Sequence, residues 1–256
     1  MRRLYEKDRI RHFLVWLAFY LGVSIVAINL GSALGVGEHA AAAVPLAVLA
    51  VVMAVHLRRS GIGPQIGLGV PPAVPAARMW FYLPLAVLAL LPLLGGVRED
   101  LAFGFAVAMT AHYVAVGFLE EVLFRGLLLR ALFREWRPVW ALLLSAVTFG
   151  VGHVASLLIG QSGADTVGQI INATVVGLIF TLVVVATGDL RAVIVAHILY
   201  NIVARLSQGI DTIQLIVAGL MVLAVYGTWL LYGAGVRDRL RDPDPAATAA
   251  TARRSA

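Results

Sequence analysis

The sequence has 256 residues, of which 61% are hydrophobic and 13% are charged, and its mean hydropathy is +0.90. This composition lies far from that of a soluble domain and indicates a chain whose solvent is the lipid bilayer. Because cysteine is absent, disulfides, thiolate metal sites and a cysteine nucleophile are excluded. The net charge of +6 does not indicate a nucleic-acid partner, because the basic residues form short clusters between long apolar runs.

The chain begins with a basic stretch, and residues 13–37 then contain no acidic or basic side chain. This apolar run is longer than the hydrophobic region of a typical signal peptide, and more hydrophobic segments follow it. We therefore interpret residues 1–12 as a basic cytoplasmic segment that precedes an uncleaved first transmembrane helix.

Uncharged runs of about 20 residues, separated by charged or turn-forming segments, predict about eight transmembrane helices. The predicted spans are 13–31, 40–57, 79–96, 101–129, 138–158, 167–187, 190–207 and 212–233. The sequence therefore predicts an all-α, polytopic transmembrane helical bundle over residues 13–236.

The distribution of lysine and arginine gives an independent prediction of topology, because these residues concentrate in cytoplasmic loops. Basic-rich and basic-poor connections alternate along the chain. The rich ones include 1–12, 58–78, 130–137 and the C-terminal tail, and the poor ones are 31–39, 96–100, 160–165 and 207–211. Both termini are thus predicted to face the cytoplasm, which requires an even number of spans.

Two segments are not expected to form regular helices. Residues 61–75 contain four glycines and four prolines, which favours an irregular cytoplasmic connection. Residues 237–256 are rich in Asp, Pro, Ala, Thr and Arg without apolar periodicity, so we expect a disordered cytoplasmic tail.

Few ionisable residues lie inside the predicted spans, where each of them is energetically costly and needs a partner, a water-filled cavity or a function. They are contributed by three helices: Glu120, Glu121 and Arg125 in the fourth span, His153 in the fifth, and His197 with Asn201 in the seventh. The four-residue spacing of Glu121 and Arg125 predicts an ion pair on one helix face. Glu120 is rotated about 100° away, so its carboxylate is free to face the bundle interior.

The depth of these residues follows from the rise of about 1.5 Å per helical residue. Counted from the cytoplasmic ends of their helices, Glu120 and Asn201 lie about 15 Å deep, His153 about 22 Å and His197 about 9 Å. These depths are compatible with one cluster that opens toward the cytoplasm.

Three motifs in this region resemble those of the CPBP family of intramembrane proteases, which includes the CAAX-processing, Rce1-like enzymes and the Abi family. The Glu-Glu-x-x-x-Arg motif of the family matches Glu120, Glu121 and Arg125, and its Phe-x-x-x-His motif matches Phe149 and His153. Its His-x-x-x-Asn motif matches His197 and Asn201. The resemblance covers a catalytic core of about residues 101–207.

The resemblance implies an intramembrane endopeptidase of the cell membrane that hydrolyses a peptide bond of a membrane-associated protein or peptide. Glu120 and His153 would activate a water molecule, and His197 and Asn201 would stabilise the oxyanion. Glu121, Arg125 and Phe149 would then be structural supports. No cofactor is favoured, because asparagine is an unusual zinc ligand and no His-Glu-x-x-His helix is present. If a divalent metal such as zinc is bound, its ligands would be Glu120, His153 and His197.

Other readings of the polar residues stay open. A proton-coupled transporter or a catalytically idle membrane partner protein would also need buried Glu and His residues. Ser162 lies in a Gly-Gln-Ser-Gly sequence similar to that of rhomboid proteases, but its predicted extracytoplasmic loop separates it from His197. His112 and Asn172 are expected to make bundle hydrogen bonds, and Asp165, Asp189 and Asp211 are expected to cap helices. The composition is rich in arginine and poor in lysine, as in bacterial chains of high genomic GC content, for which prenylated substrates are unexpected.

Overall fold

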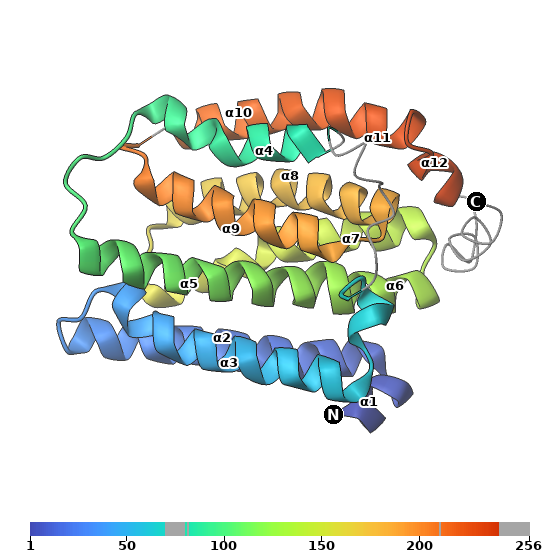
Figure 1. Ribbon diagram of the computed structural model, residues 1–256, viewed down its shortest axis with the longest axis horizontal. Helices are drawn as coiled ribbons and strands as arrows, with labels where there is room; N and C mark the ends of the chain where they lie inside the picture. Colours follow the sequence, from blue (N-terminus) through green and yellow to red (C-terminus); the bar gives the residue numbers. More distant parts are fainter. Residues whose placement is uncertain (70–79, 81, 210, 241–256) are drawn as a thin grey trace.

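The computed structural model describes residues 1–69, 80, 82–209 and 211–240. Within these residues the chain folds into a bundle of antiparallel helical segments that run side by side along its longest axis (Figure 1). The bounds of the segments are α1 Arg2–Lys7, α2 Arg9–Ala33, α3 Glu38–Ser60, η1 Gly63–Ile66, α4 Leu83–Leu90, η3 Leu91–Gly95, α5 Phe103–Glu121, η4 Val122–Leu128, α6 Leu129–Glu135, α7 Pro138–Gly152, η5 His153–Ile159, α8 Gly163–Thr187, α9 Leu190–Leu206, α10 Thr212–Val222, η6 Leu223–Gly227, α11 Thr228–Tyr232 and α12 Val236–Arg239.

The described residues contain eight main helical segments, which correspond in order to the eight predicted spans. Six of them are long and apolar enough to cross a membrane by length and composition: α2, α3, α5–η4–α6, α7–η5, α8 and α10–η6–α11. The two others are α9, with 17 residues, and α4–η3, which is a shorter apolar helix. The prediction of a polytopic helical bundle is thus confirmed.

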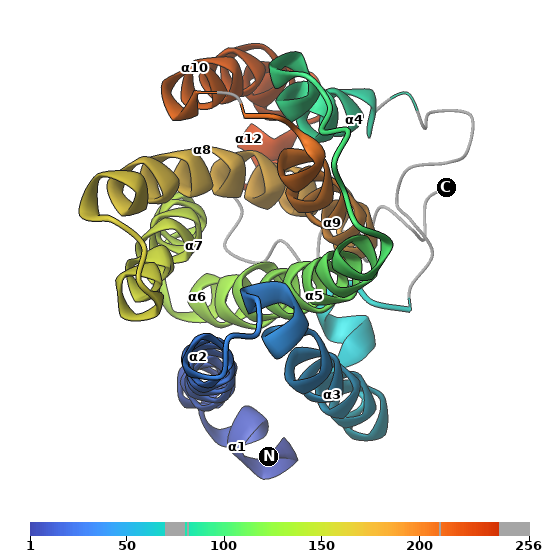
Figure 2. The same cartoon turned by 90° about the vertical axis from the view of Figure 1, so that its left-hand side faces the viewer.

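Viewed along the helix axes, the bundle has three parts (Figure 2). The pair α2 and α3 forms one side, and α4 with α10 forms the opposite side. The segments α5, α7, α8 and α9 lie between them, and α8 and α5–α6 have the largest buried shares of the six spanning segments. Helices α8 and α5–α6 therefore supply much of the core, whereas α7–η5 is only 33% buried and keeps an exposed outer face.

Two glycines allow the central helices to approach closely enough to share a site. A Cβ atom on Gly117 would lie 2.6 Å from the Ile198 side chain, so a larger residue would push α5 away from α9. A Cβ atom on Gly150 would overlap Thr174 in the same way and separate α7 from α8. Small residues at such contacts are typical of membrane helix packing, where close backbone approach supplies the association energy.

Both ends of the described chain carry short helices. The basic N-terminal segment is helical, since α1 and the first turn of α2 cover most of residues 1–12. The expected tail begins with the short helix α12, and residues 241–256 lie outside the described residues. Helices α1 and α12 lie at the same end of the bundle, as an even number of crossings requires (Figure 1).

The connection after α3 is partly described, and its first part packs against the helical core. Helix η1 places Ile66, which is fully buried, against Gly126 of η4. The rest of the predicted irregular segment, residues 70–75, lies outside the described residues, as does the start of the third predicted span at residue 79.

Candidate active site

Two of the three central motifs lie where a helix changes its geometry. The α-helix α5 ends at Glu121 and continues as the π-helix η4, which contains Arg125. Helix α7 becomes the 3₁₀ helix η5 at His153. Such changes of helical pitch are common at functional sites, because they turn side chains away from the regular helical positions.

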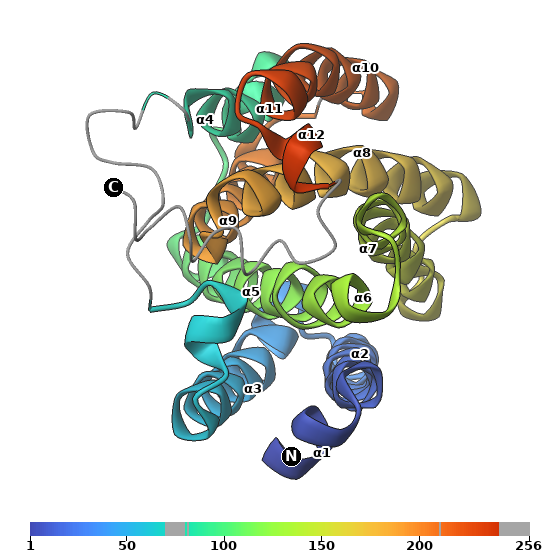
Figure 3. The ribbon, with the colours of Figure 1, turned by 90° about the vertical axis from the view of Figure 1, so that its right-hand side faces the viewer.

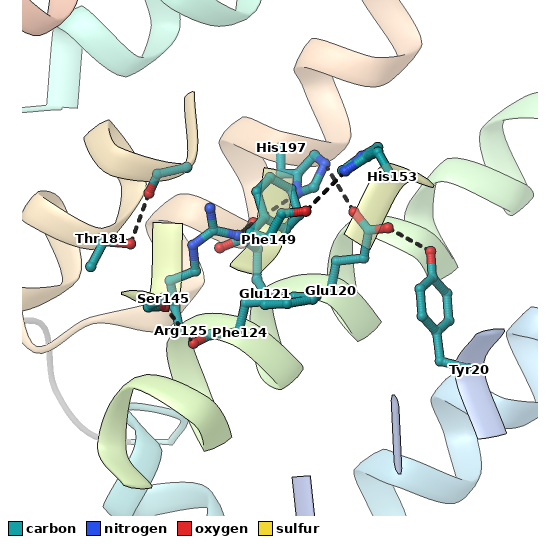
Figure 4. Close-up of polar contacts among 11 residues, drawn as sticks. Tyr20, Glu120, Glu121, Phe124, Arg125, Ser145, Phe149, His153, Thr181 and His197 are labelled. Carbon is teal, nitrogen blue, oxygen red and sulfur yellow. Dashed lines mark hydrogen bonds and ion pairs between the residues drawn. The ribbon is translucent and has the colours of Figure 1, made fainter. Parts of the chain in front are cut away.

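Glu120 points into the space between α2, α5 and α9 (Figure 4). Its Oε1 atom accepts a hydrogen bond of 2.6 Å from the Tyr20 hydroxyl of α2. Its Oε2 atom lies 3.6 Å from Nε2 of His197 on α9. The Glu120 carboxylate is therefore held by groups from two other helices, although it remains partly accessible.

Glu121 points the other way and is completely buried. Its Oε1 atom accepts hydrogen bonds of 2.8 Å from Nη1 of Arg125 and of 2.7 Å from Nδ1 of His197. The Arg125 guanidinium, also completely buried, lies 4.0 Å from the centroid of the Phe149 ring. This contact is a cation–π interaction, which stabilises a desolvated arginine. The predicted Glu121–Arg125 pair is thus present, and it also fixes the orientation of His197.

The hydrogen-bond partners of the two histidines determine where their ring protons lie. Nδ1 of His153 is 3.0 Å from the Phe149 carbonyl oxygen, which can only accept, so Nδ1 carries the proton. Nδ1 of His197 likewise donates to the Glu121 carboxylate. The Nε2 atom of each ring is therefore the one that is available for chemistry.

The four residues predicted to be catalytic line one cavity of about 350 Å³. Glu120 contributes from α5, His153 from η5, and His197 and Asn201 from α9. Tyr20 and five more residues of α2 form another wall of the cavity. The structure thus brings together residues that are more than 80 positions apart in the chain.

The cavity does not open toward the end of the bundle that was inferred from residue depth, which is the cytoplasmic end. From Glu120 the cavity extends toward Ile28, Glu38, Gln161 and Arg205, which all lie near the ends of their helices that are distant from α1 and α12. The cluster therefore opens at the end that the sequence predicts to be extracytoplasmic. Residue depths on single helices did not reveal this direction, because it depends on which end is filled by side chains.

The side chains that could bind a metal ion in the cavity are Glu120, His153 and His197. Among the described residues, no group of three or more His, Asp or Glu side chains is arranged to hold a metal ion. Nδ1 of His197 donates to Glu121 and Nδ1 of His153 donates to the Phe149 carbonyl, so Nε2 of each histidine and the Glu120 carboxylate remain as donors. A histidine that binds a metal through Nε2 commonly donates its Nδ1 proton to a carboxylate or a carbonyl oxygen, so these contacts are compatible with zinc as well as with a metal-free site.

Two residues that contact the site were not identified from the sequence. Tyr20 belongs to no motif and lies 100 positions before Glu120, so the pattern carries no signal for it. Gly177 leaves the space that Arg125 occupies, because a Cβ there would lie 2.9 Å from Nη2 of Arg125 and 3.0 Å from the Phe149 ring. A glycine in the middle of an apolar helix is a weak sequence signal for such a close contact.

Four polar residues outside the motifs make the hydrogen bonds or caps predicted for them, and one of the four, His112, also lines the cavity. Asn172 donates to the Tyr200 hydroxyl at 2.9 Å. The Nδ1 atoms of the His112 and His39 rings lie 3.0 Å apart. Both are the hydrogen bonds between helices that the sequence predicts. Asp189 and Asp211 are N-caps of α9 and α10.

The expected cap at Asp165 is wrong. Ser162 is the N-cap of α8, accepts from the Asp165 backbone N–H and donates to the Asp165 carboxylate. The serine side chain therefore satisfies one of the unpaired N–H groups at the start of the helix, and the aspartate supports it from the first turn.

Comparison with protein families matches residues 81–203 to the family described as type II CAAX prenyl endopeptidase Rce1-like. No curated protein and no solved structure matches the chain. The family match includes α5, α7, α8 and most of α9, and so contains Glu120, His153, His197 and Asn201. It excludes α2, which supplies Tyr20. Residues 81–203 therefore form an Rce1-like domain of the type II CAAX endopeptidase family, and the chain is a multi-pass membrane protein built around that domain.

Proposed function

We propose that the chain is an endopeptidase of the cell membrane that hydrolyses a peptide bond of a membrane-associated protein or peptide, with Glu120 as general base. The observation that carries the proposal is the position of the Glu120 carboxylate. It lies at the wall of a cavity with His153, His197 and Asn201, inside the segment that matches an endopeptidase family.

Glu120 and His153 are suited to hold and activate a water molecule. One carboxylate oxygen of Glu120 is occupied by Tyr20, and the other faces the cavity side of His197. His153 presents an unprotonated Nε2, which can accept a hydrogen bond from the same water. The water oxygen attacks the carbonyl carbon, its proton passes to Glu120, and the same proton is then delivered to the leaving amine as the C–N bond breaks.

Asn201 and His197 are suited to stabilise the negative charge on the carbonyl oxygen. The side-chain amide of Asn201 is a neutral donor at the cavity wall. His197 can donate from Nε2 only as an imidazolium, because its Nδ1 proton is already given to Glu121. In that form the cations His197 and Arg125 balance the two carboxylates, so the buried cluster carries no net charge.

The experiment uses the purified chain in lipid with a membrane-peptide substrate. Replacing Glu120→Gln keeps the shape of the side chain but removes the base, so we expect kcat to fall by about 100-fold or more. The matched control is Glu135→Gln on the exposed surface of α6, which should leave both kcat and thermal stability unchanged. Equal activity of Glu120→Gln and the unchanged chain would contradict the mechanism.

The metal-free form of the mechanism has its own test. Dialysis against a strong chelator should leave the cleavage rate unchanged, because the proposed steps use only Glu120, His153, His197 and Asn201. Loss of cleavage on chelation, followed by recovery with added Zn²⁺, would show that the metal-free mechanism is wrong.

A further inference from the structure

The cavity that contains Glu120 is closed at one end of the bundle and open at the other. The end that carries α1 and α12 faces the viewer in Figure 3. Toward this end the site is backed by side chains with no accessible surface, including Arg125, Leu129 and Leu190. Ile66 of η1 fills the space beside Gly126, where a Cβ would lie 3.1 Å from it. Ser145 further donates to the Phe124 carbonyl at 3.0 Å and ties α7 to η4 at this level. The lining of the cavity includes none of the described residues of α1, η1, α6 or α12.

The opposite end of the bundle faces the viewer in Figure 2. Toward this end the cavity is lined by polar side chains. Glu38 at the start of α3 pairs with Arg205 near the end of α9 at 2.9 Å. Gln161 donates to Gln169 at 2.9 Å on the other side of the opening. From His197 to the end of α9 is about 14 Å at the α-helical rise, which an extended peptide of about four residues can span.

The basic residues assign the two ends to the two sides of the membrane. Most Arg and Lys residues of the described chain lie at the closed end. They belong to α1, α6, α12 and the α6–α7 connection, to the first turns of α2 and α9, and to the last turn of α3. They are Arg2, Arg3, Lys7, Arg9, Arg11, Arg58, Arg59, Arg130, Arg134, Arg137, Arg191, Arg237 and Arg239. Among the described residues the open end carries two, Arg98 and Arg205, and each pairs with an acidic residue. Since such residues remain on the cytoplasmic side, the open end is extracytoplasmic.

We infer that the peptide bond reaches Glu120 from the extracytoplasmic side of the membrane. The substrate is then a membrane-anchored peptide whose cleavage site lies at the extracytoplasmic end of its anchor, rather than a C-terminus presented at the cytoplasmic face. The rim offers amide, carboxylate and guanidinium groups that can bind the polar backbone of an extended segment. This inference rests on the proposed function for its statement about the substrate, whereas the side of access is a property of the cavity alone.

Because the chain lacks cysteine, single-cysteine variants report on access without a background signal. Ser156→Cys lies in the cavity wall. Ser32→Cys and Glu135→Cys are exposed controls at the open and closed ends. Each variant is treated in right-side-out vesicles with a membrane-impermeant maleimide, before and after permeabilisation.

We expect Ser156→Cys and Ser32→Cys to react before permeabilisation and Glu135→Cys to react only afterwards. Reaction of Ser156→Cys only after permeabilisation, or in neither condition, would overturn the inference whether or not the chain cleaves peptides.

The substrate is tested with two reporters that carry the same cleavable segment on opposite sides of one membrane anchor. We expect the unchanged chain to cleave the extracytoplasmic reporter at least tenfold faster, and Glu120→Gln to cleave neither. Preferential cleavage of the cytoplasmic reporter would overturn the inference and leave the proposed function standing. Cleavage of neither reporter, together with labelling of Ser156→Cys from outside, would overturn the proposed function and leave the side of access standing.

Discussion

Glu120 and Glu121 are adjacent in the chain and chemically identical, yet they occupy opposite kinds of environment. Glu120 lines the cavity and is held by a tyrosine hydroxyl. Glu121 lies behind the cavity wall, where Arg125 and His197 use its Oε1 atom. The difference teaches that a helix in a bilayer can separate a reactive carboxylate from a structural one by a single residue, because successive side chains point about 100° apart.

The largest expected effect is the loss of stability on substituting Arg125, the partner of the buried Glu121. Arg125→Met removes the only cation that pairs with Glu121 within the helix and leaves its carboxylate buried beside His197 alone. Breaking a buried ion pair in this way costs about 3–5 kcal/mol of stability. Thermal unfolding in lipid or detergent should show this loss, whereas Arg134→Met, on an exposed position of α6, should change stability by less than about 0.5 kcal/mol. If the two variants are equally stable, Arg125 contributes no more to the stability of the fold than an arginine on the surface does.

A second variant crowds the Glu121–Arg125 pair sterically without removing a charge. Gly177→Ala places a methyl group against Nη2 of Arg125 and the Phe149 ring, so we expect a loss of about 1–3 kcal/mol and a lower kcat. The matched control is Gly104→Ala in α5, whose added Cβ meets no atom within 4 Å. If Gly177→Ala is as stable and active as Gly104→Ala, the packing of Arg125 does not control the site.

The smallest expected effect is on kcat, when Glu120 loses its hydrogen bond from Tyr20. Tyr20→Phe removes one hydrogen bond to Glu120, so kcat should fall by roughly tenfold while KM and folding change little. Tyr200→Phe loses a comparable hydrogen bond, to Asn172, outside the cavity, and should affect stability but not kcat. An equal effect of both variants on kcat would mean that Tyr20 acts only as a packing residue and does not position Glu120.

Much of the architecture could be predicted from the sequence because the bilayer imposes a simple rule. A segment that crosses the membrane must be apolar over about 20 residues and must satisfy its own backbone hydrogen bonds. Six of the eight helical segments meet this rule by length and composition, and α9 and α4–η3 are shorter. The Glu121–Arg125 pair could be predicted for a separate reason, because it depends only on four-residue spacing within one helix.

The helix geometry at the site was less predictable. The segment after Glu121 is π-helical and the segment from His153 is a 3₁₀ helix, whereas uniform α-helical geometry was expected for both from the sequence. A π or 3₁₀ turn rotates the following side chains relative to a regular α-helix. The assumption of regular α-helices therefore does not predict in which direction these side chains point.

The sequence by itself thus determined the bundle, the topology expected from its basic residues and the three motifs, because these depend on composition and on spacing along single helices. Only the tertiary structure decided that Tyr20 holds Glu120, that Gly177 makes room for Arg125 and that the cavity opens away from α1 and α12. Each of these depends on contacts between helices that are distant in the chain, for which one sequence carries no periodic signal.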